Sequence, residues 1–193
     1  ARLNIIEPDT WCRATDHIQE QIEQVQILEE KGFTYTIDDG VYFDTSKLSD
    51  YGKLARLDIA GLRAGARIEV TQGKRNYTDF ALWKLSPKDS RRLMEWESPW
   101  CVGFPGWHIE CSAMIEAEFG SAGEYSVDIH GGGADLLFPH HENEAAQSRC
   151  ATGKELANYW VHNGFVTING DKMSKSLGNS FFLKDALALY HPE

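Results

Sequence analysis

The order strand, glycine run, helix, strand in the second half of the chain constrains the fold more than any other sequence feature. A β-type run over 125–130 ends in three consecutive glycines, and a helical pattern follows over 139–150 with Pro139 near its first turn. A second β-type run covers 160–168. Strands that alternate with helices form α/β folds, and ligands bind beyond the carboxyl ends of their strands. We therefore predict an α/β fold in which the glycines form a turn beside the binding site.

The first half of the chain predicts a smaller set of mixed elements. Apolar residues at helical spacing indicate an amphipathic helix over 16–31, with Asp16 as its N-cap and Gly32 at its end. The other expected elements are a hairpin over 33–43 with an Asp-Gly turn, strands over 67–70 and 80–85, a boundary over 96–106 and a helix over 107–119.

Composition restricts the class of protein but not its partner. The chain has 193 residues, of which 42% are hydrophobic and 25% charged, and this argues against a disordered, collagen-like or coiled-coil chain. No stretch reaches the ~18 consecutive apolar residues of a transmembrane helix, so we expect no membrane partner. The net charge of −10 counts against a nucleic-acid partner, yet residues 53–92 carry 10 basic and 4 acidic residues. That stretch is either a solvated face or a surface that contacts nucleic acid.

The four cysteines, Cys12, Cys101, Cys111 and Cys150, indicate a reducing compartment. A disulfide-rich secreted domain would be shorter and richer in cysteine, so we expect free thiols and a cytoplasmic protein. No two of them have CxxC spacing, which leaves a mixed site of cysteine, histidine and carboxylate as the form of zinc site open to this chain.

The string HHENE over 140–144 is the first candidate site. On a helix His140 and Glu144 share one face, and an imidazole nitrogen and a carboxylate oxygen that converge there suit a divalent metal. Cys111, on an earlier predicted helix, would add a sulfur ligand. The alternative is an ordinary surface pair of His and Glu, with Cys111 as a buried core thiol.

The second candidate is the string GGGAD over 131–135. Glycines let a backbone approach a ligand closely, and Asp135 just beyond them could bind ribose hydroxyls. Neither the GxGxxG nor the Walker spacing is present, so a structural turn is the alternative.

The third candidate is the string KMSKS over 172–176, which lies on a glycine-flanked loop. Lys172 and Lys175 can present two ammonium groups to a polyphosphate and stabilise charge that develops on its oxygens. A solvated turn is the alternative, although the full string is far more specific than a generic Lys/Ser loop.

These strings resemble class I aminoacyl-tRNA synthetases, and within that class the cysteinyl-tRNA synthetase family. The specific matches are GFPGWHIECSAM over 103–114, DIHGGGADLLFPHHENEAAQS over 128–148 and DKMSKSLGN over 171–179. Weaker matches are RATDHI over 13–18, YGKL over 51–54 and KRNYTDFALWK over 74–84. The resemblance covers nearly the whole chain. It implies the second half of a Rossmann-like class I catalytic domain with a small α+β connective-peptide insertion.

The resemblance also implies roles for the candidate residues. Cys111, His140 and Glu144 match zinc ligands of the family, and Trp107 and His130 match the side walls of its cysteine pocket.

The nucleotide site follows from the same resemblance. Lys175 matches a residue that contacts ATP, Lys172 its partner, and Asp135 a position near the nucleotide. The expected cofactor is Zn²⁺, the expected substrates are cysteine, ATP with Mg²⁺ and tRNA(Cys), and the family is mostly monomeric.

The departures from the family pattern imply an internal fragment. The HIGH motif and the fourth zinc ligand, a cysteine, belong to the first half of the family's nucleotide fold, and Cys12 lies in the wrong context for that ligand. The chain begins with Ala1 instead of Met, and we expect it to be inactive in isolation. The expected units are the end of the first catalytic half over 1–15, the insertion over 16–95, the second half with the zinc site over 96–169, and the KMSKS loop with the start of a helical region over 170–193.

The implied reaction has two steps. Cysteine carboxylate attacks the α-phosphate of ATP, and a terminal ribose hydroxyl of tRNA then accepts the cysteinyl group. One alternative is a cysteine:amino-sugar ligase of mycothiol synthesis, but that family has Gln in place of His130 and lacks the Glu144 carboxylate. A non-catalytic zinc- or RNA-binding remnant of a synthetase is the other.

Overall fold

The first helix, α1 (Ile18–Glu30), follows the apolar spacing of the sequence. The computed structural model describes residues 3–59, 73–87, 89, 92–120 and 123–191. Ile22, Val25 and Leu28 are buried on the inner face of α1. As predicted, the helix ends at Gly32, whose φ of +77° is a left-handed conformation that suits glycine.

The predicted N-cap of α1 is wrong. Asp16 lies one residue too early, in the 3-10 turn η1 (Ala14–Asp16), and His17 takes the cap position without a side-chain cap hydrogen bond. The short turn shifts the helix start towards the C-terminus, which a spacing pattern of apolar residues does not register.

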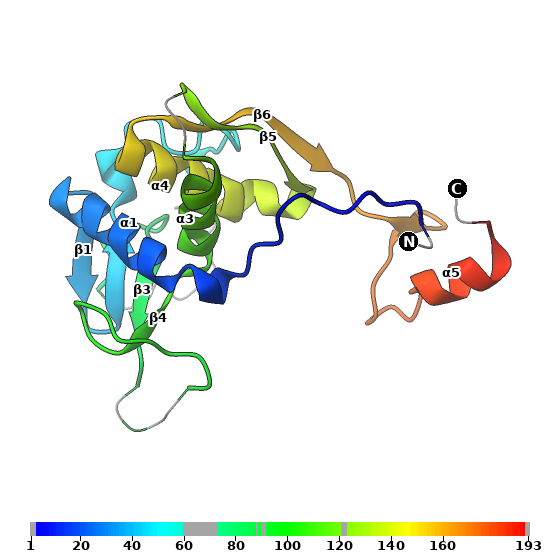
Figure 1. Cartoon of the computed structure of the whole chain (residues 1–193), viewed down its shortest axis with the longest axis horizontal. Helices are drawn as coiled ribbons and strands as arrows, with labels where there is room; N and C mark the ends of the chain where they lie inside the picture. The colour runs from blue at the N-terminus through cyan, green and yellow to red at the C-terminus, as the bar shows by residue number, and fades with distance from the viewer. Residues whose placement is uncertain (1–2, 60–72, 88, 90–91, 121–122, 192–193) are drawn as a thin grey trace.

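A four-stranded antiparallel sheet lies beside α1 (Figure 1). The predicted hairpin is confirmed, but Ile37 pairs with Gly40, so Asp38 and Asp39 form its turn instead of Asp39 and Gly40. The predicted strand over 80–85 is also confirmed, whereas the one over 67–70 lies outside the described residues. The strands are β1 (Thr34–Ile37), β2 (Gly40–Phe43), β3 (Phe80–Leu85) and β4 (Gly103–Pro105).

The predicted strand–helix–strand unit is confirmed as two parallel strands joined through a helix. These are β5 (Tyr125–Gly133), α4 (Glu142–Thr152) and β6 (Glu155–Asn163), and α3 (Trp107–Phe119) precedes them with the predicted bounds. The α/β class is thereby confirmed.

Three details of this unit differ from the sequence prediction. The second strand, predicted over 160–168, covers Glu155–Asn163 instead. The three glycines continue β5 and pair with Val161–Asn163, so they are not a turn. The helix starts after the predicted Pro139, because Phe138 has the extended φ of −137° and ψ of 133° that a following proline favours. Phe138 lies within the single wide turn η4 (Leu137–His141), which precedes α4.

One apolar core joins the sheet to the helices. Val25 of α1, Leu82 of β3, Ile109 of α3 and Ala146 of α4 belong to the same buried cluster. The stretch over 96–106, which we predict as a boundary, contains β4 and leads directly from the sheet into α3.

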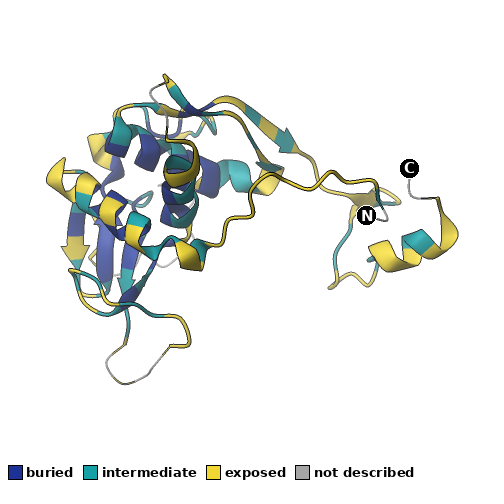
Figure 2. Ribbon diagram, in the orientation of Figure 1, coloured by how far each residue is buried: buried dark blue, intermediate teal, exposed yellow. Residues whose placement is uncertain are grey.

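The last part of the chain extends away from this core (Figures 1 and 2). It contains the antiparallel pair β7 (Thr167–Ile168) and β8 (Asp171–Lys172) and the helix α5 (Leu183–Leu189). Its residues are mostly exposed, in contrast to those of α4. No helix of the described ranges has both the length and the apolar character needed to cross a membrane.

Candidate functional site

The three predicted metal-binding side chains converge from three different elements. Cys111 comes from α3, His140 from η4 and Glu144 from the first turn of α4, and their ligand atoms all lie within 4.8 Å of one another. The structure therefore brings the sulfur donor of α3 to a nitrogen and an oxygen donor that lie four residues apart, much later in the sequence.

Glu144 is the centre of this group. Its side chain is 0% exposed, and its two oxygens lie 2.5 Å from His140 Nε2 and 2.9 Å from His130 Nε2. Burial alone would raise the pKa of Glu144, but the contacts with the two imidazoles lower it to about 2. Glu144 is thus a buried carboxylate held in its charged, ligand-competent form.

The donor set fits a metal ion. Neither Glu144 oxygen, nor His130 Nε2, has a hydrogen-bond partner of good geometry within the described part of the chain, although all three atoms are buried. Burial and the nearby carboxylates of Glu144 and Glu110 raise the pKa of Cys111 to about 12, so its thiol is protonated without a cation. A divalent cation would be a partner for the Glu144 carboxylate and for a Cys111 thiolate.

Three further histidines surround the cluster, and the sequence analysis did not assign them to the site. His108 Nδ1 lies 2.9 Å from His140 Nδ1, and His141 Nδ1 lies 2.8 Å from His162 Nε2. Desolvation is the largest effect on His108 and His141, and it lowers the pKa of each to about 4. They are therefore neutral near pH 7 and orient their neighbours by hydrogen bonding.

The number of histidines in the chain is the sequence signal that could have indicated this group of packed histidines. Five of the seven histidines of the chain belong to it: His108, His130, His140, His141 and His162. Their convergence depends on the parallel pairing of β5 with β6, which sets His162 opposite Gly132.

Gly132 is the backbone position that permits this packing. A Cβ atom at Gly132 would lie 2.7 Å from His141 Cε1, closer than real Cβ contacts. Gly132 therefore allows the close approach of a histidine ring of the same chain, while the approach of a ligand to the glycine run stays a prediction.

Trp107 and His130, the predicted side walls of the cysteine pocket, both contact the cluster but line two different hollows. The Trp107 ring stacks on His140 with 4.3 Å between centroids and is 57% exposed, whereas His130 contacts Glu144. His130 lines a cavity of about 780 Å³, and Trp107 lines a second hollow of about 380 Å³ together with Lys74.

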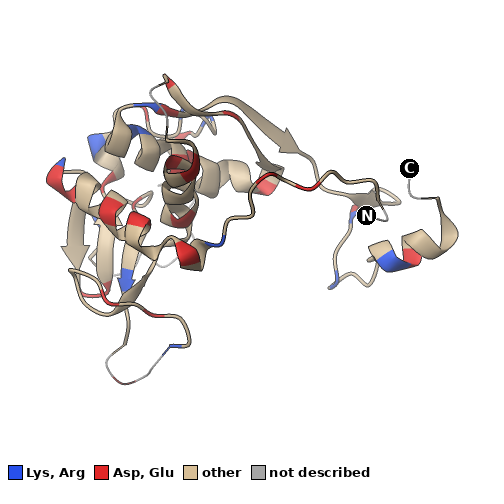
Figure 3. Cartoon of the chain, viewed as in Figure 1, with Lys and Arg blue, Asp and Glu red and all other residues tan. Residues whose placement is uncertain are grey.

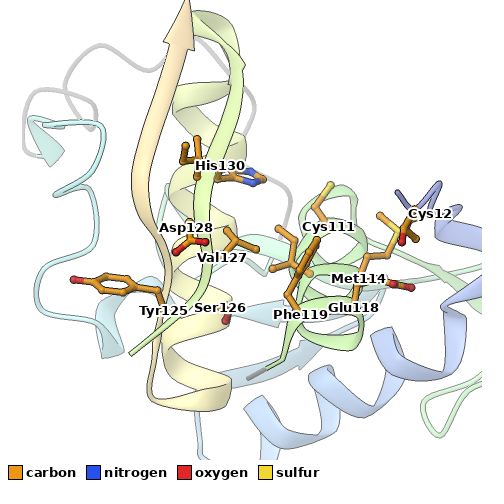
Figure 4. Close-up of a pocket in the computed structure, with 13 residues that line it drawn as sticks. Cys12, Cys111, Met114, Glu118, Phe119, Tyr125, Ser126, Val127, Asp128 and His130 are labelled. Carbon is orange, nitrogen blue, oxygen red and sulfur yellow. The ribbon is translucent and has the colours of Figure 1, made fainter. Parts of the chain in front are cut away.

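The larger cavity runs between α3 and β5 (Figure 4). Cys111 and His130 lie on its wall, so two polar groups of the cluster face an otherwise mainly apolar space. A small substrate bound in this cavity would reach a metal ion held by the cluster. The apolar part of its lining comes from Met114, Ile115, Phe119, Val127 and Ile129.

The middle residues of the HHENE string serve a different purpose. The Glu142 carboxylate accepts hydrogen bonds from the backbone N–H groups of Gly52 and Ala55, both at 2.8 Å. The Tyr51 hydroxyl donates to the Asn143 side-chain oxygen at 2.5 Å. One short string therefore holds the cluster on one side and the loop over 51–55 on the other.

The KMSKS loop lies on the extension, apart from the cluster (Figure 1). Lys172 and Lys175 are exposed, and the Lys172 ammonium lies 3.7 Å from the centre of the Phe165 ring. Asn179 closes the loop by accepting a hydrogen bond from the Ser174 backbone N–H at 2.8 Å and donating to the Lys172 carbonyl at 3.2 Å.

Asp135 occupies the end of β5. It lies in the 3-10 turn η3 (Ala134–Leu136), where its side chain is exposed. A Cβ atom at Gly133 would lie 2.4 Å from its carboxylate, so the last glycine of the run makes room for this side chain. The structure leaves the predicted role of Asp135 in nucleotide binding as a prediction.

A family model and individual relatives both match this chain over nearly its whole length. The family model of the class I (C) tRNA synthetase catalytic domain matches residues 1–193. A cysteine–tRNA ligase of Burkholderia lata is 57% identical over 178 residues, which cover 92% of this chain and 37% of that protein. Those of Sulfurovum sp. and Thermococcus kodakarensis are 55% and 50% identical, over 100% and 99% of this chain. The chain spans only 37–41% of the length of these relatives.

A solved structure supports the fold independently. The Mycobacterium tuberculosis methionyl-tRNA synthetase, in complex with methionyl-adenylate, superposes with a TM-score of 0.56 over 94% of this chain and 45% of that one. The sequence identity is 18%, so this similarity concerns the fold alone.

Proposed function

The chain belongs to the class I (C) tRNA synthetase catalytic-domain family, and from this we propose that the protein containing it is a cysteine–tRNA ligase. This activity consists of forming cysteinyl-adenylate from cysteine and ATP and transferring the cysteinyl group to tRNA(Cys). The observation that carries the proposal is the convergence of Cys111, His140 and Glu144 beside a cavity of about 780 Å³.

Cys111, His140 and Glu144 are the residues that would hold a zinc ion. When bound, zinc supplies a Lewis acid that binds a thiolate far more strongly than a hydroxyl, which would separate cysteine from serine without an editing step. The chain supplies three ligands and leaves one position for another group, as in open zinc sites.

The protein residues around the cluster orient it and shape the pocket. His108 fixes the ring of His140 through the contact between their Nδ1 atoms, and Trp107 covers that ring by stacking. His130 contacts Glu144 and faces the cavity, where it would border the bound cysteine.

The KMSKS lysines would act on the second substrate, ATP with Mg²⁺. Attack of the cysteine carboxylate on the α-phosphate forms one P–O bond and breaks the bond to the departing pyrophosphate, while negative charge develops on the phosphate oxygens. Lys172 and Lys175 carry ammonium groups on exposed side chains that can approach these oxygens and stabilise the charge. Asp135, at the end of β5, would contact the ribose of ATP.

The proposed macromolecular partner is tRNA(Cys), and the proposed location is the cytoplasm, with the enzyme acting as a monomer. Of the basic residues between 53 and 92, Arg75 is 57% exposed but pairs with Asp44 at 3.2 Å. The Lys74 ammonium donates to the Tyr77 carbonyl at 3.2 Å. Contact with the tRNA acceptor end would therefore compete with these internal pairs.

The two alternatives are less favoured. The relatives described above are cysteine–tRNA ligases, and this chain has both the His130 and the Glu144 that we expect to be absent from an amino-sugar ligase. A non-catalytic remnant would not require five histidines packed around one buried carboxylate.

The test uses a full-length enzyme that contains this chain. Cys111→Ser should lose bound zinc and, in the same variant, the affinity for cysteine in ATP–pyrophosphate exchange, whereas the exposed Cys101→Ser is the matched control and should lose neither. Unchanged zinc content in Cys111→Ser would contradict the proposed zinc site. A variant without zinc that still prefers cysteine over serine would contradict its role in selection.

A further inference from the structure

A second group of metal-ligating side chains lies at the other end of α3. Cys12, His17 and Glu118 each offer one ligand atom, and these atoms all lie within 4.8 Å of one another. The three residues come from the segment before η1, the N-cap of α1 and the last turn of α3. None of them belongs to the motifs that indicate the proposed function, apart from His17 within the weak RATDHI match.

The donor types suit a thiophilic divalent cation. A thiolate, a neutral imidazole and a carboxylate together carry two negative charges, which balance a dication such as Zn²⁺. Sulfur and imidazole donors favour zinc over the hard cations Mg²⁺ and Ca²⁺, which prefer oxygen.

The histidine of this group is poised like a metal ligand. Its ring is 14% exposed, with Nε2 3.7 Å from Glu118 Oε1 and Nδ1 3.5 Å from Glu20 Oε1. His17 Nδ1 is buried and, within the described residues, has no hydrogen-bond partner of good geometry. Glu20 lies on the Nδ1 side of the ring and Glu118 on the Nε2 side.

The surrounding surface favours cation binding. Neither α1 nor α3 contains a lysine or arginine, and acidic side chains follow both helices (Figure 3). Cys12 and Glu118 are exposed, so an ion reaches them from solvent.

The position of the group relates it to the cavity. Cys12, Cys111 and Glu118 all line the space of about 780 Å³, and Figure 4 shows Cys12 and Glu118 at the end opposite His130. Cys111 and Glu118 are seven residues apart on α3, which corresponds to two turns and roughly 10 Å along the helix.

We propose that Cys12, His17 and Glu118 form a second, structural zinc site that fastens the segment before η1 to the end of α3. Residues 4–13 are all exposed, so apolar burial contributes little to holding this segment in place. Zinc bound by Cys12 would anchor it along one rim of the cavity. The site is independent of the zinc ion proposed for Cys111, His140 and Glu144.

Cobalt substitution separates the two sites. The full-length enzyme carrying Cys111→Ser is stripped of metal and titrated with Co²⁺, and absorption is recorded in the thiolate-to-cobalt charge-transfer region. The cysteine that the resemblance implies as the fourth ligand of the first site remains in this background, so the second site is read as the amount of thiolate-ligated cobalt that depends on Cys12. Adding Cys12→Ser should remove one equivalent, whereas adding the exposed Cys101→Ser should remove none.

Glu118→Gln in the same background keeps side-chain size and should weaken cobalt binding by roughly tenfold or more. Circular dichroism of each variant verifies that the fold is intact. The absence of a thiolate band in the Cys111→Ser enzyme, or an equal amount of thiolate-ligated cobalt with and without Cys12→Ser, overturns the second site. Neither outcome bears on the proposed activity, which is read from ATP–pyrophosphate exchange.

Discussion

The metal-ligand cluster and the KMSKS loop differ in how the fold holds them. Cys111, His140 and Glu144 come from three packed elements, and Glu144 is fully buried between two imidazoles. Lys172 and Lys175 are exposed on an extension, where hydrogen bonds of Asn179 and Ser174 close a short loop. The difference teaches that the groups proposed to select the amino acid are fixed in advance, while those proposed to act on phosphate are left free to move towards it.

The strongest way to sharpen this comparison is to remove a loop lysine. Lys175→Ala in a full-length enzyme should lower the rate of adenylate formation by about 10²- to 10³-fold, because a preplaced charge that stabilises the transition state is lost. Zinc content and the free energy of unfolding should stay unchanged. Lys184→Ala, an exposed lysine of α5, is the control. A loss of zinc in Lys175→Ala would show that loop and cluster are not separate.

The second test concerns the pH dependence of the cluster. The pKa of Glu144 is lowered from 4.5 to about 2, so its charged form stabilises the metal-free chain above pH 4.5. This stability is lost as the pH falls from about 4.5 to about 2, and the loss should be on the order of 3 kcal/mol.

The measurement is urea unfolding of the metal-free protein across that pH range. Glu144→Gln should remove this part of the pH dependence, and Glu124→Gln, at an exposed position, should keep it. Identical pH profiles for Glu144→Gln and the unchanged protein would argue against a buried, charged Glu144.

The third test places a side chain at Gly132, the backbone position against which His141 packs. Gly132→Ala would bring a Cβ atom to 2.7 Å from His141 Cε1, and we expect it to lower the free energy of unfolding by about 1–3 kcal/mol. Gly164→Ala is the matched control, because a Cβ atom there meets nothing within 4 Å. Equal stability of the two variants in chemical denaturation would mean that the histidine packing adapts without cost.

The smallest effect is expected in the loop. Asn179→Ala removes the part-buried hydrogen bond from the Ser174 N–H and the exposed one to the Lys172 carbonyl, and should change the free energy of unfolding by about 1 kcal/mol. ATP affinity, measured by calorimetry on the same variant, should fall by more than stability does. A large loss of stability would contradict the view of the loop as locally held.

The sequence predicts best where a local pattern decides the structure. The bounds of α3 and of the strand over 80–85 agree with prediction, and two aromatic residues, Phe80 and Trp83, favour the strand locally. The helical pairing of His140 with Glu144, four residues apart, is likewise a local property.

The remaining differences come from contacts between distant segments. The glycine run reads as a turn because glycines carry no periodic signal, yet its pairing with Val161–Asn163 makes it a strand. The approach of His108 to His140 and of His141 to His162 depends on the packing of α3 and on the register of β5 and β6. These contacts between histidines depend on tertiary packing, so the spacing of residues in the sequence cannot predict them.

The bidentate contact of Glu142 with the N–H groups of Gly52 and Ala55 has a mechanical consequence. Glu142 and Glu144 stand on the same first turn of α4, one fastened to the loop over 51–55 and the other to the imidazoles. Because both side chains stand on one turn, we expect a displacement of the loop over 51–55 to shift Glu144 as well.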